Sequence, residues 1–395
     1  MKRRSFISTS ATAAIAPLSG VIDANWTSVA TGADIKITAV HTFRIPRGLF
    51  VKVETDAGIC GWGESSPNGP ETVEAMIRHQ LANWLIGQNP FDVEPLWDKM
   101  FWENHDFGPS GTLPYAIAGI DLALWDIKGK ALQQPVYKLL GGKYNTEFTV
   151  YGGIPLYSGK VPVEEAVERA LKLADKGFKV IKLRMQIREY NLDPIPDPTL
   201  KYYLAIRKAL PDSIELFVDP NEGYNGARAV TIGKALQALG MKYYESPCPL
   251  ENHKDTAEVA KALDIPVMAG EKCYTRWQFR DLILEANPDM IQPDLIKAGG
   301  ITEVKKIAAL GQAFFKPIVP HNTKPTLGTA AALHLMASIS NAGPFIEFIE
   351  PELYGPVMST VEENITFIDG KLYLPERPGL GLVVNEKRVR ELSNS

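Results

Sequence analysis

Hydrophobic and polar residues alternate in three short runs near the start of the folded part of the chain. These runs predict an antiparallel meander of three strands, IKITAVHTF (35–43), LFVKVETDAG (49–58) and ICGWGE (59–64). The turns between them contain Gly or Pro, as expected for short connections in a meander.

Helical spacing of apolar residues follows the meander. It predicts one helix around residues 72–86 and a second over residues 114–129, where Ile117, Ile120, Leu124 and Ile127 recur at helical spacing. A short third helix is expected in PVYKLLGG (135–142), which has Pro near its start and Gly just past its end. Residues 34–146 are therefore predicted to form an α+β domain.

From residue 147 the pattern becomes a repeat of apolar strand, turn and amphipathic helix. Eight strands can be counted, in the order FTVYGG, VIKLRM, ELFVD, KYYES, PVMAGE, MIQPDLI, PIVPHN and FIEFIE. The intervening stretches, such as VEEAVERALKLADKG (163–177), suit helical crossovers between parallel strands. The prediction for residues 147–355 is an α/β fold in which the strands close into a (β/α) barrel.

The last segment, residues 356–395, does not continue the repeat. It contains a hairpin pattern in which Asp369 and Gly370 form the turn between two apolar runs, and we expect no helix there. We predict a tail that returns to the first domain.

The N-terminus has the pattern of an export signal. MKRRSFISTSATAAIAPLSG joins a basic head to a weakly apolar stretch, and its Arg3 and Arg4 resemble the bacterial twin-arginine signal. The alternative is a disordered basic tail, which the apolar stretch disfavours. Residues 1–30 are therefore left out of the fold, and a periplasmic location is predicted. No later stretch has 18 uninterrupted apolar residues, so no membrane anchor is expected.

Composition narrows the class of partner. The chain has 45% hydrophobic and 22% charged residues and a formal net charge of −4, so it offers no basic field for nucleic acid. A small-molecule substrate is favoured instead. Its cysteines, Cys60, Cys248 and Cys273, form no CxxC pair, which argues against a disulfide framework and a thiolate zinc site.

Three acids end consecutive strands of the predicted barrel, one repeat apart: Asp219, Glu245 and Glu271. Taken singly, each would be a helix cap or a solvated turn residue. The carboxyl ends of barrel strands share one face, however, where loops from different repeats meet. Bare carboxylates there would repel one another, and a hard divalent cation with oxygen ligands relieves that repulsion. The pattern therefore predicts a Mg²⁺ site.

Further polar groups end the remaining strands. Asp294 ends IQPD and His321 ends IVPH on consecutive strands, and a carboxylate against one imidazole nitrogen fixes the tautomer that a general base needs. Lys182 and Arg184 lie on one face of VIKLRM and are expected to bind anionic groups. Glu347 ends the last strand, although Glu350 competes for that assignment.

Together these residues resemble the mandelate racemase subgroup of the enolase superfamily. The resemblance is carried by the three acids, by QPDLIKAGGI, by PHN and by the helix AIAGIDLALWDIKGKALQQPVYKLLGG. The muconate-lactonizing subgroup would be expected to have a lysine in place of Asp294, so that branch is disfavoured. The resemblance implies a modified TIM barrel, (β/α)7β, with an α+β cap formed by the N-terminal segment and the C-terminal tail. It also implies abstraction of the proton alpha to a carboxylate, with Mg²⁺ holding the resulting enediolate.

The resemblance also implies further site residues. Glu347 would hydrogen-bond the second enediolate oxygen. The meander and the terminal hairpin would close over the barrel mouth, so that the turns near residues 44–50 and FWENHDFGPSG (101–111) shape the substrate pocket. Homo-oligomers are common in the family, although no sequence feature marks an interface. Candidates for substrate binding are Asn221, Lys297, Arg44, His105 and Tyr151.

One position departs from the family pattern, which commonly has Lys-x-Lys on the second strand. Arg184 takes the place of the second lysine, and a guanidinium does not act as a base. Either Lys182 is a base with a lowered pKa, or His321 performs the acid–base work alone while Arg184 holds a substrate oxygen. The second option favours syn-dehydration of a sugar acid. The alternatives are a cycloisomerase, epimerase or racemase on a similar acid, or an exported binding protein without turnover.

Overall fold

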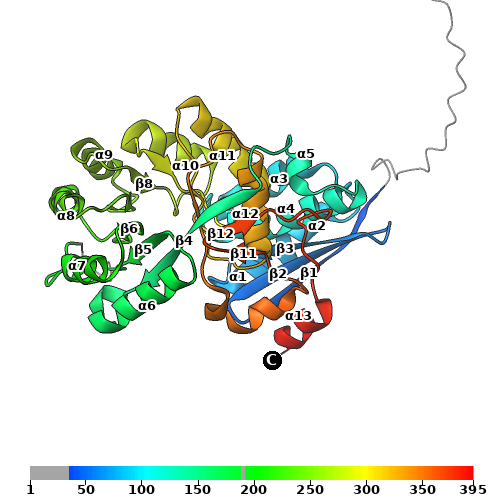
Figure 1. Ribbon diagram of the computed structural model, residues 1–395. Helices are drawn as coiled ribbons and strands as arrows, with labels where there is room; N and C mark the ends of the chain where they lie inside the picture. Colours follow the sequence, from blue (N-terminus) through cyan, green and yellow to red (C-terminus); the bar gives the residue numbers. More distant parts are fainter. Residues whose placement is uncertain (1–34, 188–191, 395) are drawn as a thin grey trace, which may run out of the picture. The chain divides into compact units, whose positions relative to one another are not determined.

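The computed structural model describes residues 35–187 and 192–394 (Figure 1). The predicted export signal, residues 1–30, lies outside the described residues. Within them, no helix combines the length and the apolar character needed to cross a bilayer.

The cap, residues 35–142, begins with an antiparallel sheet in the order β1 (Ile37–Ile45), β2 (Gly48–Thr55) and β3 (Cys60–Ser65). Its helices are α1 (Pro70–Met76), the π-helical turn η1 (Ile77–Leu81), α2 (Ala82–Leu85), α3 (Val93–Trp102), the 3-10 turn η2 (His105–Phe107), α4 (Thr112–Ala131) and α5 (Val136–Leu139). Helix α4 lies directly on β3, because Gly61 and Gly63 carry no side chain. A Cβ at either position would lie 2.0 Å from a carbonyl oxygen of α4.

The second part is a parallel sheet in the order β4 (Glu147–Pro155), β5 (Val180–Arg184), β6 (Glu215–Asp219), β7 (Tyr244–Glu245), β8 (Val267–Ala269) and β9 (Met290–Ile291). Single parallel bridges from Ile291 to Ile318 and from Ile318 to Ala342 extend the ladder. The last strand, β10 (Ile346–Glu347), pairs with β4. The predicted α/β barrel fold with an N-terminal cap is therefore confirmed.

Helices connect successive strands and cover the outside of the sheet (Figure 1). They are α6 (Val163–Asp175), α7 (Thr199–Ala209), α8 (Gly226–Ala238), α9 (His253–Ala262), α10 (Arg276–Asp281) with the π-helical turn η4 (Leu282–Ala286), α11 (Ile301–Ala313) and α12 (Leu327–Ala337). The apolar stripe of α6 buries Ala166, Ala170 and Leu173. Helix α12 is buried along its whole length, because it also contacts β3 and α5 of the cap.

Two predictions for the C-terminal segment, the position of its hairpin and the absence of a helix, were wrong. The hairpin of β11 (Phe367–Ile368) and β12 (Lys371–Tyr373) forms, but β12 pairs with the amino end of β4. The site residues lie at the carboxyl ends of the strands, so the hairpin does not close over the mouth. The expectation of no helix was also wrong, because α13 (Glu386–Ser393) buries Val389 and Leu392 and packs against β1. Two 3-10 turns, η5 (Pro351–Leu353) and η6 (Gly355–Thr360), precede the hairpin.

Candidate active site

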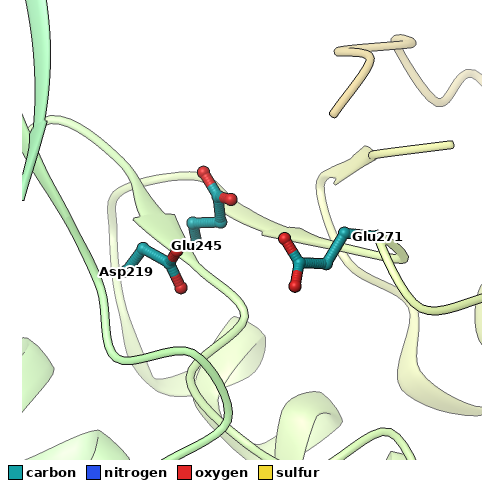
Figure 2. Close-up of side chains that lie close together, drawn as sticks. All are labelled: Asp219, Glu245 and Glu271. Atoms are coloured by element: carbon teal, nitrogen blue, oxygen red, sulfur yellow. The ribbon is translucent and has the colours of Figure 1, made fainter. Parts of the chain in front are cut away.

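Three carboxylates meet at the carboxyl ends of β6, β7 and β8 (Figure 2). Asp219 and Glu245 are the last residues of their strands, and Glu271 follows β8 by two residues. The side chains are at most 4% exposed, and one oxygen from each lies within 4.8 Å of the others. In the part of the chain that the structure describes, Asp219 Oδ2 and Glu245 Oε2 accept no hydrogen bond. Buried oxygens without donors, grouped in this way, suit a hard divalent cation.

The electrostatics of this group support the same conclusion. Burial raises the pKa of Asp219 to about 6 and that of Glu245 to about 8, and the nearby Lys182 ammonium only partly offsets the effect. Burial acts on Glu271 in the same direction, but the charges of His321 and Lys297 outweigh it and hold the pKa of Glu271 below its usual range. A divalent cation would stabilise the ionised form of all three acids.

Lys182 connects this cluster to the last strand. Its side chain is 1% exposed, and Nζ lies 2.9 Å from Glu245 Oε1 and 2.8 Å from Glu347 Oε1. Burial alone would lower the pKa of Lys182, but the carboxylates of Glu245, Glu347 and Asp219 together raise it above its ordinary value. Two of the carboxylates that raise the pKa of Lys182, Glu245 and Asp219, belong to the acid triad.

His321 and Asp294 form a close pair on the other side of Glu271. His321 Nδ1 lies 2.7 Å from Asp294 Oδ2, while Asp294 Oδ1 accepts the backbone N–H groups of Ile296 and Lys297 at 2.8 and 3.1 Å. Burial raises the pKa of Asp294, but the hydrogen bond from His321 more than reverses this, so its carboxyl stays ionised. Nδ1 therefore carries the donated proton, and Nε2 is left as the acceptor.

The free face of His321 points toward other site groups. Nε2 lies 3.3 Å from Glu271 Oε2 and 3.7 Å from Glu347 Oε2. Glu347 Oε2 also accepts the backbone N–H of Asn322 at 3.1 Å. The competing Glu350 forms an ion pair with Lys176 instead, so Glu347 is the residue of this strand that belongs to the site.

A cavity of about 620 Å³ opens over these groups. The structure brings together at its wall most of the residues that the sequence predicted, namely Lys182, Arg184, Asn221, Glu271, Asp294, Lys297, His321 and Glu347. Asp219 and Glu245 are buried next to Lys182.

The other candidates for substrate binding, Arg44, His105 and Tyr151, do not line this cavity. Arg44 lies in β1 and forms ion pairs with Glu71 and Glu74 of α1. His105 is exposed, and its ring is hydrogen-bonded to a carbonyl of α3. Tyr151 is fully buried, with Lys182 Nζ 5.0 Å from the centre of its ring, so it supports the site from within the barrel.

Sequence reasoning missed several residues of the cavity wall. From the cap this is the segment 66–68 after β3, whereas Arg47 lies in the predicted pocket turn near residues 44–50 and does line the cavity. From the barrel they include Lys272, Lys324 and Tyr354. Lys272 directly follows Glu271 and Lys324 lies three residues after His321, so their closeness to strand ends was an available signal.

Comparisons with known proteins agree with this geometry. Residues 22–141 match the model of the mandelate racemase/muconate lactonizing enzyme N-terminal domain, and residues 165–388 match an enolase C-terminal domain-like model. A D-galactonate dehydratase from Pectobacterium atrosepticum is 35% identical over 91% of this chain and 95% of its own length.

Two solved structures are also similar. A mandelate racemase/muconate lactonizing protein from Paracoccus denitrificans, complexed with magnesium, has a TM-score of 0.85 and 32% identity over 90% of this chain and 98% of that chain. The 3,6-anhydro-D-galactonate cycloisomerase from Zobellia galactanivorans has a TM-score of 0.81 and 31% identity over 90% of this chain and 99% of that chain.

Proposed function

This chain belongs to the mandelate racemase/muconate lactonizing enzyme family of the enolase superfamily, and we propose that it is a Mg²⁺-dependent acid-sugar dehydratase. The observation that carries the proposal is the His321–Asp294 pair facing the same cavity as a buried triad of acids. The likeness to a D-galactonate dehydratase supports an acid sugar as the substrate.

Asp219, Glu245 and Glu271 would hold the metal ion. Their grouped, buried oxygens, two of which lack donors among the described residues, fit an oxygen-preferring cation. When bound, Mg²⁺ would supply positive charge close to the substrate carboxylate and so make its alpha-proton more acidic.

His321 would move the protons. With Nδ1–H held by Asp294, the lone pair of Nε2 can accept the alpha-proton of the substrate. The electron pair left on the alpha-carbon then expels the beta-hydroxyl, and the imidazolium returns its proton so that water leaves. The resulting enol tautomerises to a 2-keto acid.

The surrounding charges would stabilise and orient the substrate. Lys182 is a buried ammonium beside the acid cluster, and Glu347 lies between it and His321. Arg184, Lys297 and Lys324 line the same cavity and can bind carboxylate or hydroxyl oxygens. Because Arg184 does not deprotonate, one face of the substrate carbon lacks a second base at this position, which favours elimination over racemization.

The experiment is a screen of purified protein against a library of acid sugars with Mg²⁺, read by 2-keto acid formation. We expect at least one aldonic acid to be dehydrated and activity to be lost in chelator. No product from any acid sugar, with bound metal verified, would contradict the proposal.

A second candidate is cycloisomerization, which the likeness to the 3,6-anhydro-D-galactonate cycloisomerase supports. Anhydro sugar acids therefore belong in the same screen. A product isomeric with its substrate, formed without loss of water, would move this candidate ahead of dehydration.

We also propose that the enzyme is exported, on the basis of Arg3 and Arg4 and the weakly apolar stretch after them. A twin-arginine route would carry the folded enzyme out of the cytoplasm.

A further inference from the structure

Helix α11 begins beside the active site without a capping side chain of its own. The residue at its N-cap is Gly300, which has φ 96° and follows the turn that starts at Asp294. Asp121, from helix α4 of the cap, takes the capping role, because its Oδ2 accepts the backbone N–H of Thr302 at 3.1 Å. A Cβ at Gly300 would lie 2.3 Å from that same oxygen, so the contact requires glycine.

Two tryptophans of the cap hold the same turn. Trp97 Nε1 donates to the carbonyl of Gly299 at 2.7 Å, and Trp125 Nε1 donates to Thr302 Oγ1 at 2.9 Å. Both indoles are at most 8% exposed, and Asp121 is fully buried. Buried hydrogen bonds of this kind are costly to break, because each partner would be left unsatisfied.

At its other end the turn forms hydrogen bonds with Asp294 of the catalytic pair. The backbone N–H of Ala298 donates to the carbonyl of Asp294 at 2.8 Å, and the N–H of Gly300 donates to the carbonyl of Leu295 at 2.7 Å. The N–H groups of Ile296 and Lys297 donate to Asp294 Oδ1, whose other oxygen accepts Nδ1–H of His321. Hydrogen bonds to the cap therefore fix one end of the 294–302 turn, bonds within the turn connect residues 294–300, and Asp294 joins the turn to the imidazole.

We propose that Asp121 is a positioning residue for the reaction: by capping α11 from the cap domain, it fixes the 294–302 turn and so aims the His321–Asp294 pair. The proposal rests on the proposed role of His321 as the base. It assigns to the cap a function beyond enclosing substrate, because the orientation of a barrel side chain depends on a cap carboxylate.

The same helix provides a matched control. Asp126 is 2% exposed and also makes buried hydrogen bonds, accepting the backbone N–H groups of Trp62 and Leu380, each at 2.9 Å. These partners belong to β3 and to the C-terminal tail. Replacing Asp126 by Ala removes buried hydrogen bonds of the cap that go to Trp62 and Leu380, not to the 294–302 turn.

The test compares Asp121→Ala, Asp121→Asn and Asp126→Ala in the full-length enzyme. The first readout is the downfield proton NMR signal of His321 Nδ1–H, which is assigned by its loss in His321→Asn. This measurement needs no substrate. The second is kcat and KM for the best acid sugar, with rates expressed per Mg²⁺-binding site counted by calorimetry.

We expect Asp121→Ala to broaden or shift the Nδ1–H signal and to lower kcat by about 10- to 100-fold, since a misplacement of about 1 Å can cost that much. KM and the Mg²⁺ dissociation constant should change little, because the metal ligands come from other strands. Asp121→Asn should restore most of both readouts, because its amide oxygen can still accept the Thr302 N–H. Asp126→Ala should leave the signal and kcat per site unchanged.

If Asp121→Ala does not fold, Gly300→Ala takes its place, because the new methyl displaces the Asp121 carboxylate while the residue remains. An unchanged Nδ1–H signal and kcat in Asp121→Ala or Gly300→Ala would overturn the proposal, as would an equal loss in Asp126→Ala. If no acid sugar is turned over, the proposed function fails, and the NMR comparison still decides the positioning role.

Discussion

Replacement of Asp294 by Asn should disable the base by reversing the tautomer of His321. The carboxylate has three donors: the N–H groups of Ile296 and Lys297 on Oδ1, and Nδ1–H of His321 on Oδ2. An asparagine has only one acceptor oxygen. If that oxygen points toward the backbone, it accepts the N–H groups of Ile296 and Lys297. The NH2 group of the asparagine then donates to Nδ1 of His321. The proton of the neutral imidazole must then move to Nε2, the atom that should accept the substrate proton.

The size of the effect follows from the same contacts. The opposite orientation leaves both backbone donors unsatisfied instead of neither, and each such group costs about 1–3 kcal/mol. The competent tautomer is therefore disfavoured by about 2–6 kcal/mol, which lowers its population by roughly 30- to 10⁴-fold. Loss of the carboxylate charge also destabilises the imidazolium, so we expect kcat to fall by about 10²- to 10⁴-fold. The loss should still be less complete than in His321→Asn, which has no imidazole.

The assay is steady-state formation of the 2-keto acid by Asp294→Asn at saturating Mg²⁺, with Mg²⁺ affinity measured by calorimetry as the control. Metal affinity should stay within a few-fold of wild type, because Asp294 lies outside the acid triad. A kcat within about threefold of wild type would refute the tautomer argument.

Three further outcomes are expected. Glu245→Gln should abolish Mg²⁺ binding and turnover while circular dichroism stays native, because an amide replaces a buried anionic ligand; activity that persists in excess chelator, with metal verified as absent, would contradict this. Burial raises the pKa of Asp121 from 3.8 to about 7, so its stabilising proton is fully bound below pH 3.8 and lost as the pH rises through 7. The Tm of metal-free wild type should therefore fall from about pH 5 to 8, and Asp121→Asn should fall less; parallel curves would count against the shift. The double variant Arg3→Lys, Arg4→Lys should stay in the cytoplasm on cell fractionation, whereas wild-type protein that is itself retained with an uncleaved N-terminus would refute export.

The strand-end groups could be predicted from the sequence because their positions are local properties. An apolar run fixes where a barrel strand ends, and the carboxyl ends of parallel strands share one face. This was enough to place Asp219, Glu245 and Asp294 next to their partners. The alternation of apolar and polar residues does not determine which carboxylate oxygen accepts a hydrogen bond from which donor, because that depends on the backbone geometry of the loops.

The predictions that failed depend on contacts between distant parts of the chain. The cap turn near residues 44–50 does reach the cavity, but through Arg47, while the named candidate Arg44 pairs with α1. Helix α13 was missed because its eight residues bury only Val389 and Leu392, too few for a clear apolar stripe. The pairing of β12 with the amino end of β4 joins segments more than two hundred residues apart, and no local pattern specifies such a partner.

The most direct measurement of the central claim is proton NMR in D2O, with Mg²⁺ and the best acid sugar, comparing wild type with His321→Asn. It follows exchange of the alpha-proton and formation of the 2-keto acid in the same sample. Because His321 Nε2 is the acceptor that faces the cavity, we predict that wild type shows both processes and that His321→Asn shows neither. Alpha-proton exchange in His321→Asn at close to the wild-type rate would contradict the account and identify another base.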